Sequence, residues 1–295
     1  MAVSTATAGV VGRYGRLGRT VLQAKRLRLP WIPIVILTTL IVSAVFAPLL
    51  APHDPTEISL GDVRIAPFKT MTHPLGTDVL GRDILSRLIF GARNSATISL
   101  TALAVGVTLG TTLGLVSGYV GKWVDTIIMR ITDGLLGFPS ILVAMIVIAV
   151  MGTGIQNIVV AVAATTWPRF ARMVRGEALS AKERDYVIMA RVIGVPPHVI
   201  VRRHIFSAVA NTVMIIASIM VAQVILLEAS LSFLGLGFPP GAPAWGIMVA
   251  EGRQAILTAW WLSLIPGLVI TAVVMAFNYF GDWLRDTLDP KLRRL

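Results

Sequence analysis

The sequence predicts an all-α, polytopic membrane protein with six transmembrane helices. Hydrophobic residues make up 55% of the 295 residues and charged residues 14%, with a mean hydropathy of +0.79, whereas a soluble globular protein carries about 25% charge. Apolar runs of about twenty residues, long enough to cross a bilayer, recur along the chain. Of the 26 lysines and arginines, 20 lie in segments 1–29, 119–130, 169–204 and 282–295. The positive-inside rule assigns these segments, and hence both termini, to the cytoplasm.

This pattern divides the chain into five parts. They are a cytoplasmic tail (1–29), a first transmembrane helix (30–52), an extracytoplasmic loop with an interfacial helix (53–93), a five-helix core (94–282) and a cytoplasmic tail (283–295). The first apolar run is longer than the core of a typical signal peptide and has no convincing small-residue cleavage site. Within the loop we expect a helix from about Asp83 to Gly91 that lies flat on the outer surface, with an ion pair between Asp83 and Arg87.

Several small or polar residues in the core have expected packing roles. Gly106, Gly110, Gly114 and Gly118 recur every four residues, so they line one face of a helix and predict close approach of a neighbouring helix. Glycine and proline near residues 134–139 predict a bend in the third span. A carboxylate in a span is costly unless paired, so we expect Asp133 to pair with Arg130 or with a neighbouring helix.

The charged segment 177–207 interrupts the apolar spans and contains a short amphipathic helix. Tyr186, Met189, Ala190 and Ile193 fall at positions i, i+3, i+4 and i+7, which places them on one face. Gly194 and the prolines that follow it predict the end of this helix. At about ten residues the helix is too short to span a bilayer. Its apolar face must therefore contact another protein or the membrane surface.

Several classes of function lack the residues they need. There is no cysteine, and the four histidines lie far apart in the sequence without metal-ligand spacing, so no metal site is expected. The net charge of +11 is dispersed among apolar spans without a nucleic-acid-binding motif. No phosphate-binding loop is present, so the chain is not expected to hydrolyse ATP or to catalyse another reaction.

Three motif regions resemble one family of membrane proteins. Glu177-Ala178-Leu179, then Gly194 seventeen residues after the glutamate, then His204-Ile205-Phe206, resembles the EAA loop of ABC-importer permeases. Residues 73–93 and 259–292 resemble the C-type permease subunits of dipeptide, oligopeptide and nickel importers. One departure is Ser207, which stands where the family usually has proline.

The resemblance implies a type I ABC-importer permease fold in the bacterial inner membrane, with the EAA loop acting as the coupling helix that contacts an ATPase subunit. The implied partners are a second homologous permease subunit, two ATP-binding subunits that hold ATP and Mg, an extracytoplasmic solute-binding protein and the lipid bilayer; the chain itself binds no cofactor. The expected cargo is a dipeptide or oligopeptide, although nickel chelates, glutathione, opines and haem use the same scaffold. An ATP-independent secondary carrier or channel is the alternative of a different class, but such carriers commonly have two similar halves, which this sequence lacks.

Two sets of site residues follow. The residues expected to couple to the ATPase are Glu177, Ala178, Arg184, Asp185, Tyr186, Met189, Ala190, Arg191, Ile193 and Gly194. Asn211, Gln223 and Glu228 are candidates for the translocation path, with hydrogen bonding between helices as the alternative role of each.

Overall fold

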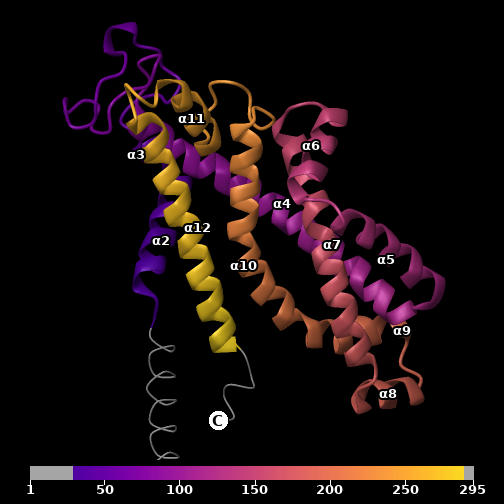
Figure 1. The fold of residues 1–295 in the computed structure, drawn as a ribbon. Coiled ribbons are helices and arrows are strands. Elements are labelled where there is room, and N and C mark those ends of the chain that lie inside the picture. The colour runs from indigo at the N-terminus through magenta and orange to yellow at the C-terminus, as the bar shows by residue number, and fades with distance from the viewer. Residues whose placement is uncertain (1–28, 289–295) are drawn as a thin grey trace, which may run out of the picture.

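The computed structural model describes residues 29–288, and this part of the chain is built from helices (Figure 1). They are α2 (Trp31–Val45), α3 (Ala47–Leu50), the 3-10 helix η1 (Leu60–Asp62), α4 (Ile84–Val120), α5 (Lys122–Leu136), α6 (Ser140–Met151), α7 (Ile155–Lys182), α8 (Asp185–Val192), α9 (Pro197–Val199), the π-helix η2 (Ile200–Ile205), α10 (Phe206–Phe233), α11 (Trp245–Gly252), the 3-10 helix η3 (Arg253–Ala255) and α12 (Trp261–Leu288). The all-α prediction is confirmed for the described residues. Most of the two predicted cytoplasmic tails lies outside them.

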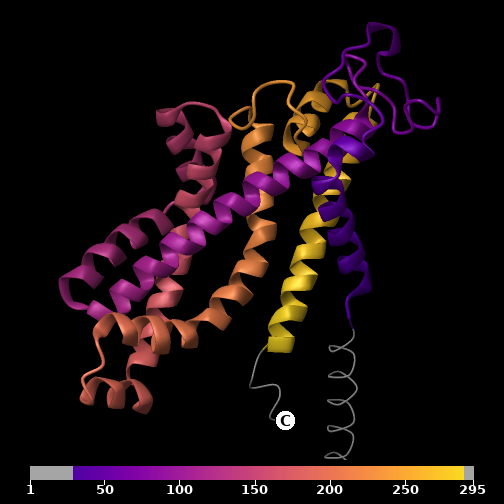
Figure 2. The ribbon, with the colours of Figure 1, turned by 180° about the vertical axis from the view of Figure 1, so that it is seen from behind.

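The molecule has two separate ends (Figures 1 and 2). Residues 51–83 and α11 form one of them, which we call the loop end, and α8 and α9 form the other, which we call the α8 end. Helices α10 and α12 run between the ends and pack against each other, and α2 packs against both α4 and α12. The long predicted loop and the charged segment that contains α8 therefore lie at opposite ends of the molecule.

Three helices are long and apolar enough to cross a bilayer, namely α4, the continuous helix Pro197–Phe233 formed by α9, η2 and α10, and α12. The α5–α6 pair would be a fourth, because the two helices meet the same test together. Helix α2 has 15 residues, or about 22 Å of helix, which is shorter than the hydrocarbon core of roughly 30 Å. Helix α7 runs from Ile155 to Lys182 and carries three arginines after Pro168. The number of six transmembrane helices stays a prediction.

The predicted bend of the third span is a complete break. Helix α5 ends at Leu136 and α6 begins at Ser140, and the two axes differ by 99°. Pro139 directly precedes α6, and a proline cannot donate the backbone hydrogen bond that would continue α5.

The expectation of a separate interfacial helix ending at Gly91 is wrong. The start near Asp83 is confirmed, but α4 runs unbroken from Ile84 to Val120, so the expected boundary after residue 93 falls inside a helix. Gly91 serves packing: a Cβ atom there would lie 2.6 Å from Cδ1 of Trp245 on α11. The Trp245 indole N–H also donates to the Leu88 carbonyl at 3.0 Å. The glycine therefore lets α11 dock onto α4.

The predicted glycine face of α4 is confirmed as a packing surface, with α7 as the neighbouring helix. A Cβ atom on Gly106 would lie 2.8 Å from the Thr166 Cβ atom, and one on Gly118 would lie 2.8 Å from the Ala178 Cβ atom. Gly110 and Gly114 approach α7 equally closely between these two points. Close backbone approach of this kind holds helices together where lipid removes the hydrophobic drive between them.

Candidate functional site

The charged segment 177–207 begins inside α7. Glu177, Ala178 and Leu179 belong to the last turns of this helix. Ala178 is fully buried and faces Gly118 of α4. Ala178, which was expected to couple to the ATPase, is thus not available for direct contact with a partner protein, because its methyl group fills the space beside Gly118. The first part of the segment is a structural anchor.

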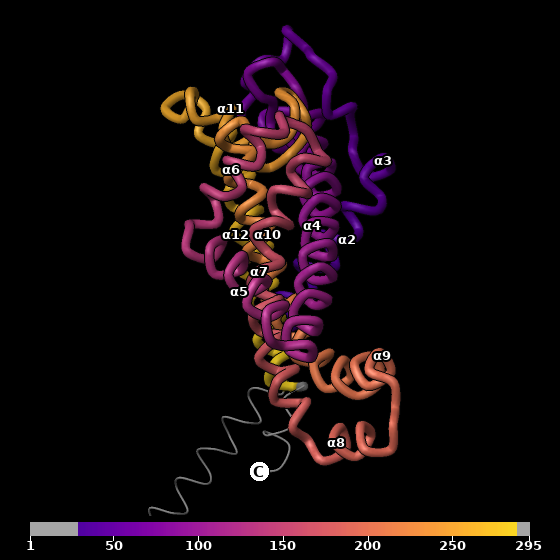
Figure 3. The backbone as a smooth tube through the Cα atoms, turned by 90° about the vertical axis from the view of Figure 1, so that its right-hand side faces the viewer, coloured from indigo at the N-terminus to yellow at the C-terminus, as the bar shows by residue number. Residues whose placement is uncertain are grey.

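Helix α8 lies at the α8 end, outside the bundle of long helices (Figure 3), and several of its large apolar side chains are exposed. The exposed fractions are 44% for Tyr186, 65% for Met189 and 78% for Ile193, which are three of the four predicted apolar positions. The exposed residues Arg184, Asp185 and Arg191 are the polar ones expected beside them. Ile188 and Val192, which we did not assign to this surface, are exposed as well.

The fourth predicted position, Ala190, lies on the other side of α8. Ala190 is 6% exposed and Val187 is fully buried, so these two residues hold α8 against the rest of the chain. At about 100° per residue, Ala190 lies between the exposed Tyr186 and the buried Val187. The assignment of Ala190 to the exposed surface is therefore wrong. Sequence spacing alone could not decide, because α8 has apolar residues on both sides.

The predicted stop at Gly194 is confirmed and takes the form of a Schellman motif. The Val195 N–H donates to the Ala190 carbonyl at 3.0 Å and the Gly194 N–H donates to the Arg191 carbonyl at 3.1 Å. Gly194 has φ of +81°, the left-handed conformation that glycine adopts without a steric cost. An added Cβ atom would meet no heavy atom within 4 Å. A substitution there would therefore act through backbone strain and not through a clash.

Ser207 lies in a continuous helix. The residues from Pro197 lead through the π-helix η2 into α10 without a break, and the Ser207 hydroxyl donates to the Arg203 carbonyl at 2.9 Å. Ile200 and Ile205 are buried and anchor η2. The Tyr186 and His204 rings lie 6.1 Å apart between centroids, so α8 is adjacent to η2.

Ion pairs fasten the helices next to α8. The Arg175 guanidinium donates from Nη2 to Oδ2 of Asp125 on α5 at 2.6 Å, and a second bond joins Nε to Oδ1. Arg172 of α7 pairs with Asp133 of α5, so the prediction that Asp133 pairs with a neighbouring helix is confirmed. The Lys182 ammonium donates to the Tyr119 carbonyl at 3.1 Å. The bundle of α4, α5 and α7 is thus a fixed base from which α8 extends.

The three candidate path residues do not lie together. Asn211 and Gln223 are exposed on α10, whereas Glu228 is fully buried. The Gln223 side-chain oxygen accepts a hydrogen bond from Arg169 of α7, so this residue does form the bond between helices that was the alternative role. Glu228 accepts from the Ser232 hydroxyl at 2.8 Å within α10.

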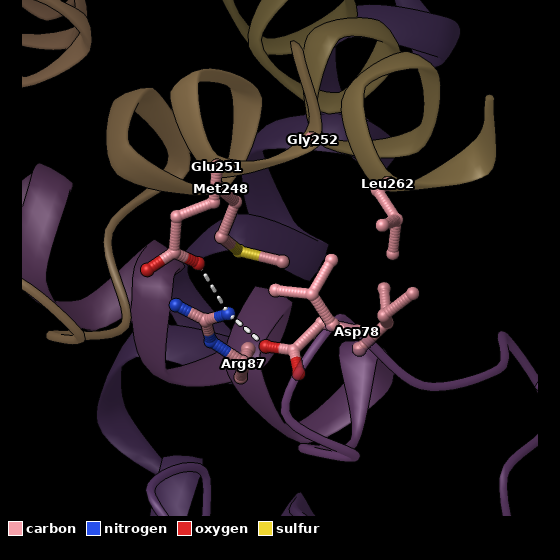
Figure 4. Close-up of a pocket in the computed structure, with 8 residues that line it drawn as sticks. Asp78, Arg87, Met248, Glu251, Gly252 and Leu262 are labelled. Carbon is pink, nitrogen blue, oxygen red and sulfur yellow. Dashed lines mark hydrogen bonds and ion pairs between the residues drawn. The ribbon is translucent and has the colours of Figure 1, made fainter. Parts of the chain in front are cut away.

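A buried ion-pair network at the loop end was not predicted (Figure 4). The Arg82 guanidinium donates to Asp78 at 2.6 Å and to Glu251 of α11 at 2.9 Å, and Arg87 donates to Glu251 at 2.7 Å and also pairs with Asp78. Arg87 is 1% exposed. The expected pair of Arg87 with Asp83 is wrong, because Asp83 instead caps α4 by accepting from the Ser86 N–H at 2.7 Å. The network joins the loop to α11.

Comparison with known proteins gives the family. A family model described as the inner membrane component of binding-protein-dependent transport systems matches residues 106–294. The chain belongs to this family. It is an ABC-importer permease, and the resemblance of its motifs is confirmed.

Relatives and a solved structure agree with this assignment. The permease is 44% identical over 255 residues to the glutathione transport system permease protein GsiD of Shigella flexneri, covering 86% of this chain and 84% of the relative. It is 38% identical over 271 residues to the dipeptide transport system permease protein DppC of Alkalihalophilus pseudofirmus, covering 92% and 88%. A crystal structure of an amino acid ABC transporter with histidines superposes with a TM-score of 0.52 at 14% identity, covering 72% of this chain and 95% of that one. This last likeness supports the permease fold alone.

Proposed function

We propose that this permease is one subunit of an ATP-driven importer of short peptides and that α8 docks onto an ATP-hydrolysing subunit. The observation that carries the proposal is the apolar surface of α8, where Tyr186, Met189, Val192 and Ile193 are 44–78% exposed. Removal of apolar surface from water contributes roughly 25 cal/mol per Å² to the free energy of binding. Helix α8 has 8 residues and carries arginines beside this surface. Short amphipathic helices of this kind bind with their apolar side in a hydrophobic groove of a partner protein.

The path of the chain supports a six-span topology. Helices α2, α4, the α5–α6 pair, α7, α10 and α12 each lead from one end of the molecule toward the other (Figures 1 and 2). With the α8 end in the cytoplasm, the basic segments 119–130 and 169–204 lie on the cytoplasmic side. The start of α2 and the end of α12, which adjoin the two basic tails, lie on the same side, as the positive-inside rule requires. Both termini then lie in the cytoplasm, and the loop end faces a solute-binding protein.

The proposed assembly contains a second homologous permease and two ATP-binding subunits, which hold ATP and Mg. Closure of the ATPase pair would move α8, and the continuous helix from Pro197 to Phe233 would carry this movement into the membrane. Switching a two-state pore from 1:99 to 99:1 requires about 5.5 kcal/mol of differential binding. Docking of α8 is the contact through which this free energy would reach the permease.

Cross-linking from α8 tests the docking proposal. The chain has no cysteine, so Met189→Cys gives a single attachment point for a photoactivated reagent, and Leu257→Cys, 98% exposed near η3, is the matched control. In the assembled transporter, Met189→Cys should cross-link to the ATP-binding subunit with a yield that changes on addition of ATP. Equal cross-linking of both variants to that subunit, or labelling of lipid alone from position 189, would contradict the proposal.

The substrate proposal rests on the names of the relatives. Dipeptides are the first candidate class, and the tripeptide glutathione is the second, because a relative at 44% identity is named for its transport. Uptake of a labelled dipeptide and of labelled glutathione into proteoliposomes with the binding protein and ATP distinguishes them. Uptake of neither would refute the peptide class. Uptake by the permease alone without ATP would instead support an ATP-independent secondary carrier or channel.

A further inference from the structure

Two histidines and an aspartate converge at the loop end. His53 follows α3, His73 lies in the loop, and Asp83 precedes α4. Nδ1 of His73 lies 3.0 Å from Oδ1 of Asp83, and Nδ1 of His53 lies 3.9 Å from Oδ2. One ligand atom from each residue can be chosen so that all three lie within 4.8 Å of one another. The two histidines lie far apart in the sequence, but the loop folds back on itself and brings the centroids of their rings to 4.6 Å.

The Asp83 carboxylate is held in place by its surroundings. Its side chain is fully buried, and Oδ2 accepts hydrogen bonds from the Ser86 N–H and hydroxyl, both at 2.7 Å. The Ser86 hydroxyl in turn accepts from the His53 backbone N–H at 3.0 Å. Oδ1 is thereby turned toward the His73 ring. Outer hydrogen bonds of this kind orient carboxylates that bind metal ions.

His53 has a ring nitrogen that no described protein group satisfies. Its Nδ1 atom is buried and has no hydrogen-bond partner within residues 29–288. A buried polar atom without a partner is costly, and most such atoms in proteins are satisfied by protein, water or an ion. The side chain of His53 is one-third exposed and that of His73 is 12% exposed. Both side chains are therefore partly open to solvent, although Nδ1 of His53 itself is buried.

We propose that His53, His73 and Asp83 bind one divalent transition-metal ion of the zinc class. Two imidazole nitrogens and one carboxylate oxygen match Zn²⁺, whereas Ca²⁺ and Mg²⁺ prefer oxygen ligands throughout. With bonds of about 2.0–2.2 Å in a tetrahedral site, neighbouring ligand atoms lie about 3.3–3.6 Å apart. Nδ1 of His73 lies 3.0 Å from Oδ1 of Asp83, and ligand atoms of the three residues lie within 4.8 Å of one another. Side-chain shifts of about 1 Å therefore bring three ligand atoms to this spacing. A water molecule would take the fourth position.

Such an ion would fasten the loop to α4. It would join residues 53 and 73 to the first residue before the helix, next to the ion pairs of Arg82 and Arg87 with α11. Metal binding of this kind contributes to folding, because the site does not exist in the unfolded chain. The proposal predicts that zinc stabilises the loop end without acting in ATP hydrolysis.

The test uses the full transporter complex, purified with a tag that contains no histidine and stripped with a chelator. Zinc bound at saturation is measured by metal analysis and titration calorimetry, and Co²⁺ absorption reports the ligand geometry. The wild-type complex should bind one more Zn²⁺ than the His53→Gln or His73→Gln complexes, or bind it at least tenfold more tightly. Asp83→Asn, which keeps an oxygen to cap α4, should weaken binding similarly.

His198→Gln is the matched control, because His198 is exposed in α9 at the α8 end. This variant should bind zinc like the wild type. Zinc should also raise the melting temperature of the wild-type complex but not that of His53→Gln. Equal zinc content and affinity in the wild type and in both histidine variants, with the complexes intact by size-exclusion chromatography, would overturn the proposal.

Discussion

The two ends of the permease are built in opposite ways. At the loop end, charged side chains are buried and paired, as in the contacts of Asp78, Arg82 and Arg87 with one another and with α11. At the α8 end, large apolar side chains such as Met189 and Ile193 face solvent. A buried charge network fixes one geometry, because any displacement leaves a charge without its partner. An exposed apolar surface is complete only when a partner covers it. The loop end thus satisfies its charges within one chain, whereas α8 leaves its large apolar side chains exposed, which is the basis of the docking proposed for it.

Removal of the Asp78 carboxylate should have the largest effect on the stability of the loop end. Asp78→Ala leaves the buried guanidinium groups of Arg82 and Arg87 with Glu251 as their remaining acidic partner. We expect a loss of about 3–5 kcal/mol of unfolding free energy, as for other broken buried ion pairs. The melting temperature in detergent measures this loss. Glu57→Ala, which removes an exposed acidic residue of the same loop, is the control and should change the free energy by less than about 0.5 kcal/mol.

A second substitution tests whether the base beneath α8 is as rigid as the loop end. Gly114→Ala would place a Cβ atom 2.8 Å from the Val174 Cβ atom, and overpacking of this kind costs about 1–3 kcal/mol. Gly176→Ala on the facing helix α7 meets no heavy atom within 4 Å and should instead be neutral or stabilising by up to about 1 kcal/mol. The two melting temperatures should move in different directions. A shift of the same size and sign in both variants would show that the close contact of α4 with α7 is not what matters.

The turn after α8 should have a smaller effect. Gly194→Ala forces a left-handed conformation on a residue with a Cβ atom, at a cost of about 1 kcal/mol. Because the site is open, a bulkier residue should cost no more in packing but would alter the surface presented beside Ile193. Gly194→Asn is the control, since asparagine also adopts this conformation. ATPase stimulation by loaded binding protein should fall in Gly194→Ala and be largely kept in Gly194→Asn.

A substitution on the exposed side of α8 should change transport but have almost no effect on stability. Met189→Glu changes a side chain that is 65% exposed, so the unfolding free energy of the isolated permease should stay within about 0.5 kcal/mol of the wild type. Transport should nevertheless be lost, because a charge would have to be buried in the docking groove. Met71→Glu, at a residue that is 97% exposed in the loop, is the matched control. Normal transport and ATPase stimulation by Met189→Glu would contradict the role proposed for α8.

Sequence reasoning succeeded where the decisive signal is local or periodic. The stop at Gly194 depends on a few neighbouring residues, and the glycine face of α4 depends on a four-residue repeat, so both were predicted correctly. The same reasoning misread Gly91. A glycine that ends a helix and a glycine that admits a tryptophan look alike until Trp245, more than 150 residues later, is placed beside it.

The errors at the candidate sites have the same origin. Ala190 was assigned to an exposed surface because its spacing fits one, and Ala178 was assigned to the coupling set by its motif, but the helices packed against these two residues decide their burial. The partners of Arg87 and the meeting of His53 with His73 depend on how the loop folds over α4 and α11, which no local pattern encodes. Tyr186, Met189 and Ile193 were identified correctly as exposed, since a short helix leaves one side uncovered.

Helix α4 has a consequence for how the two ends communicate. Its 37 residues correspond to about 55 Å, well beyond a hydrocarbon core of roughly 30 Å, so the helix must lie obliquely in the membrane or project from it. Its first turn contains Arg87 of the buried network, and its last turns hold Gly118 against α7 just before α8. One continuous helix thus links the loop end to the α8 end. If α4 tilts as a rigid body, a displacement of its first turn at the loop end is accompanied by a displacement of its last turn at the α8 end.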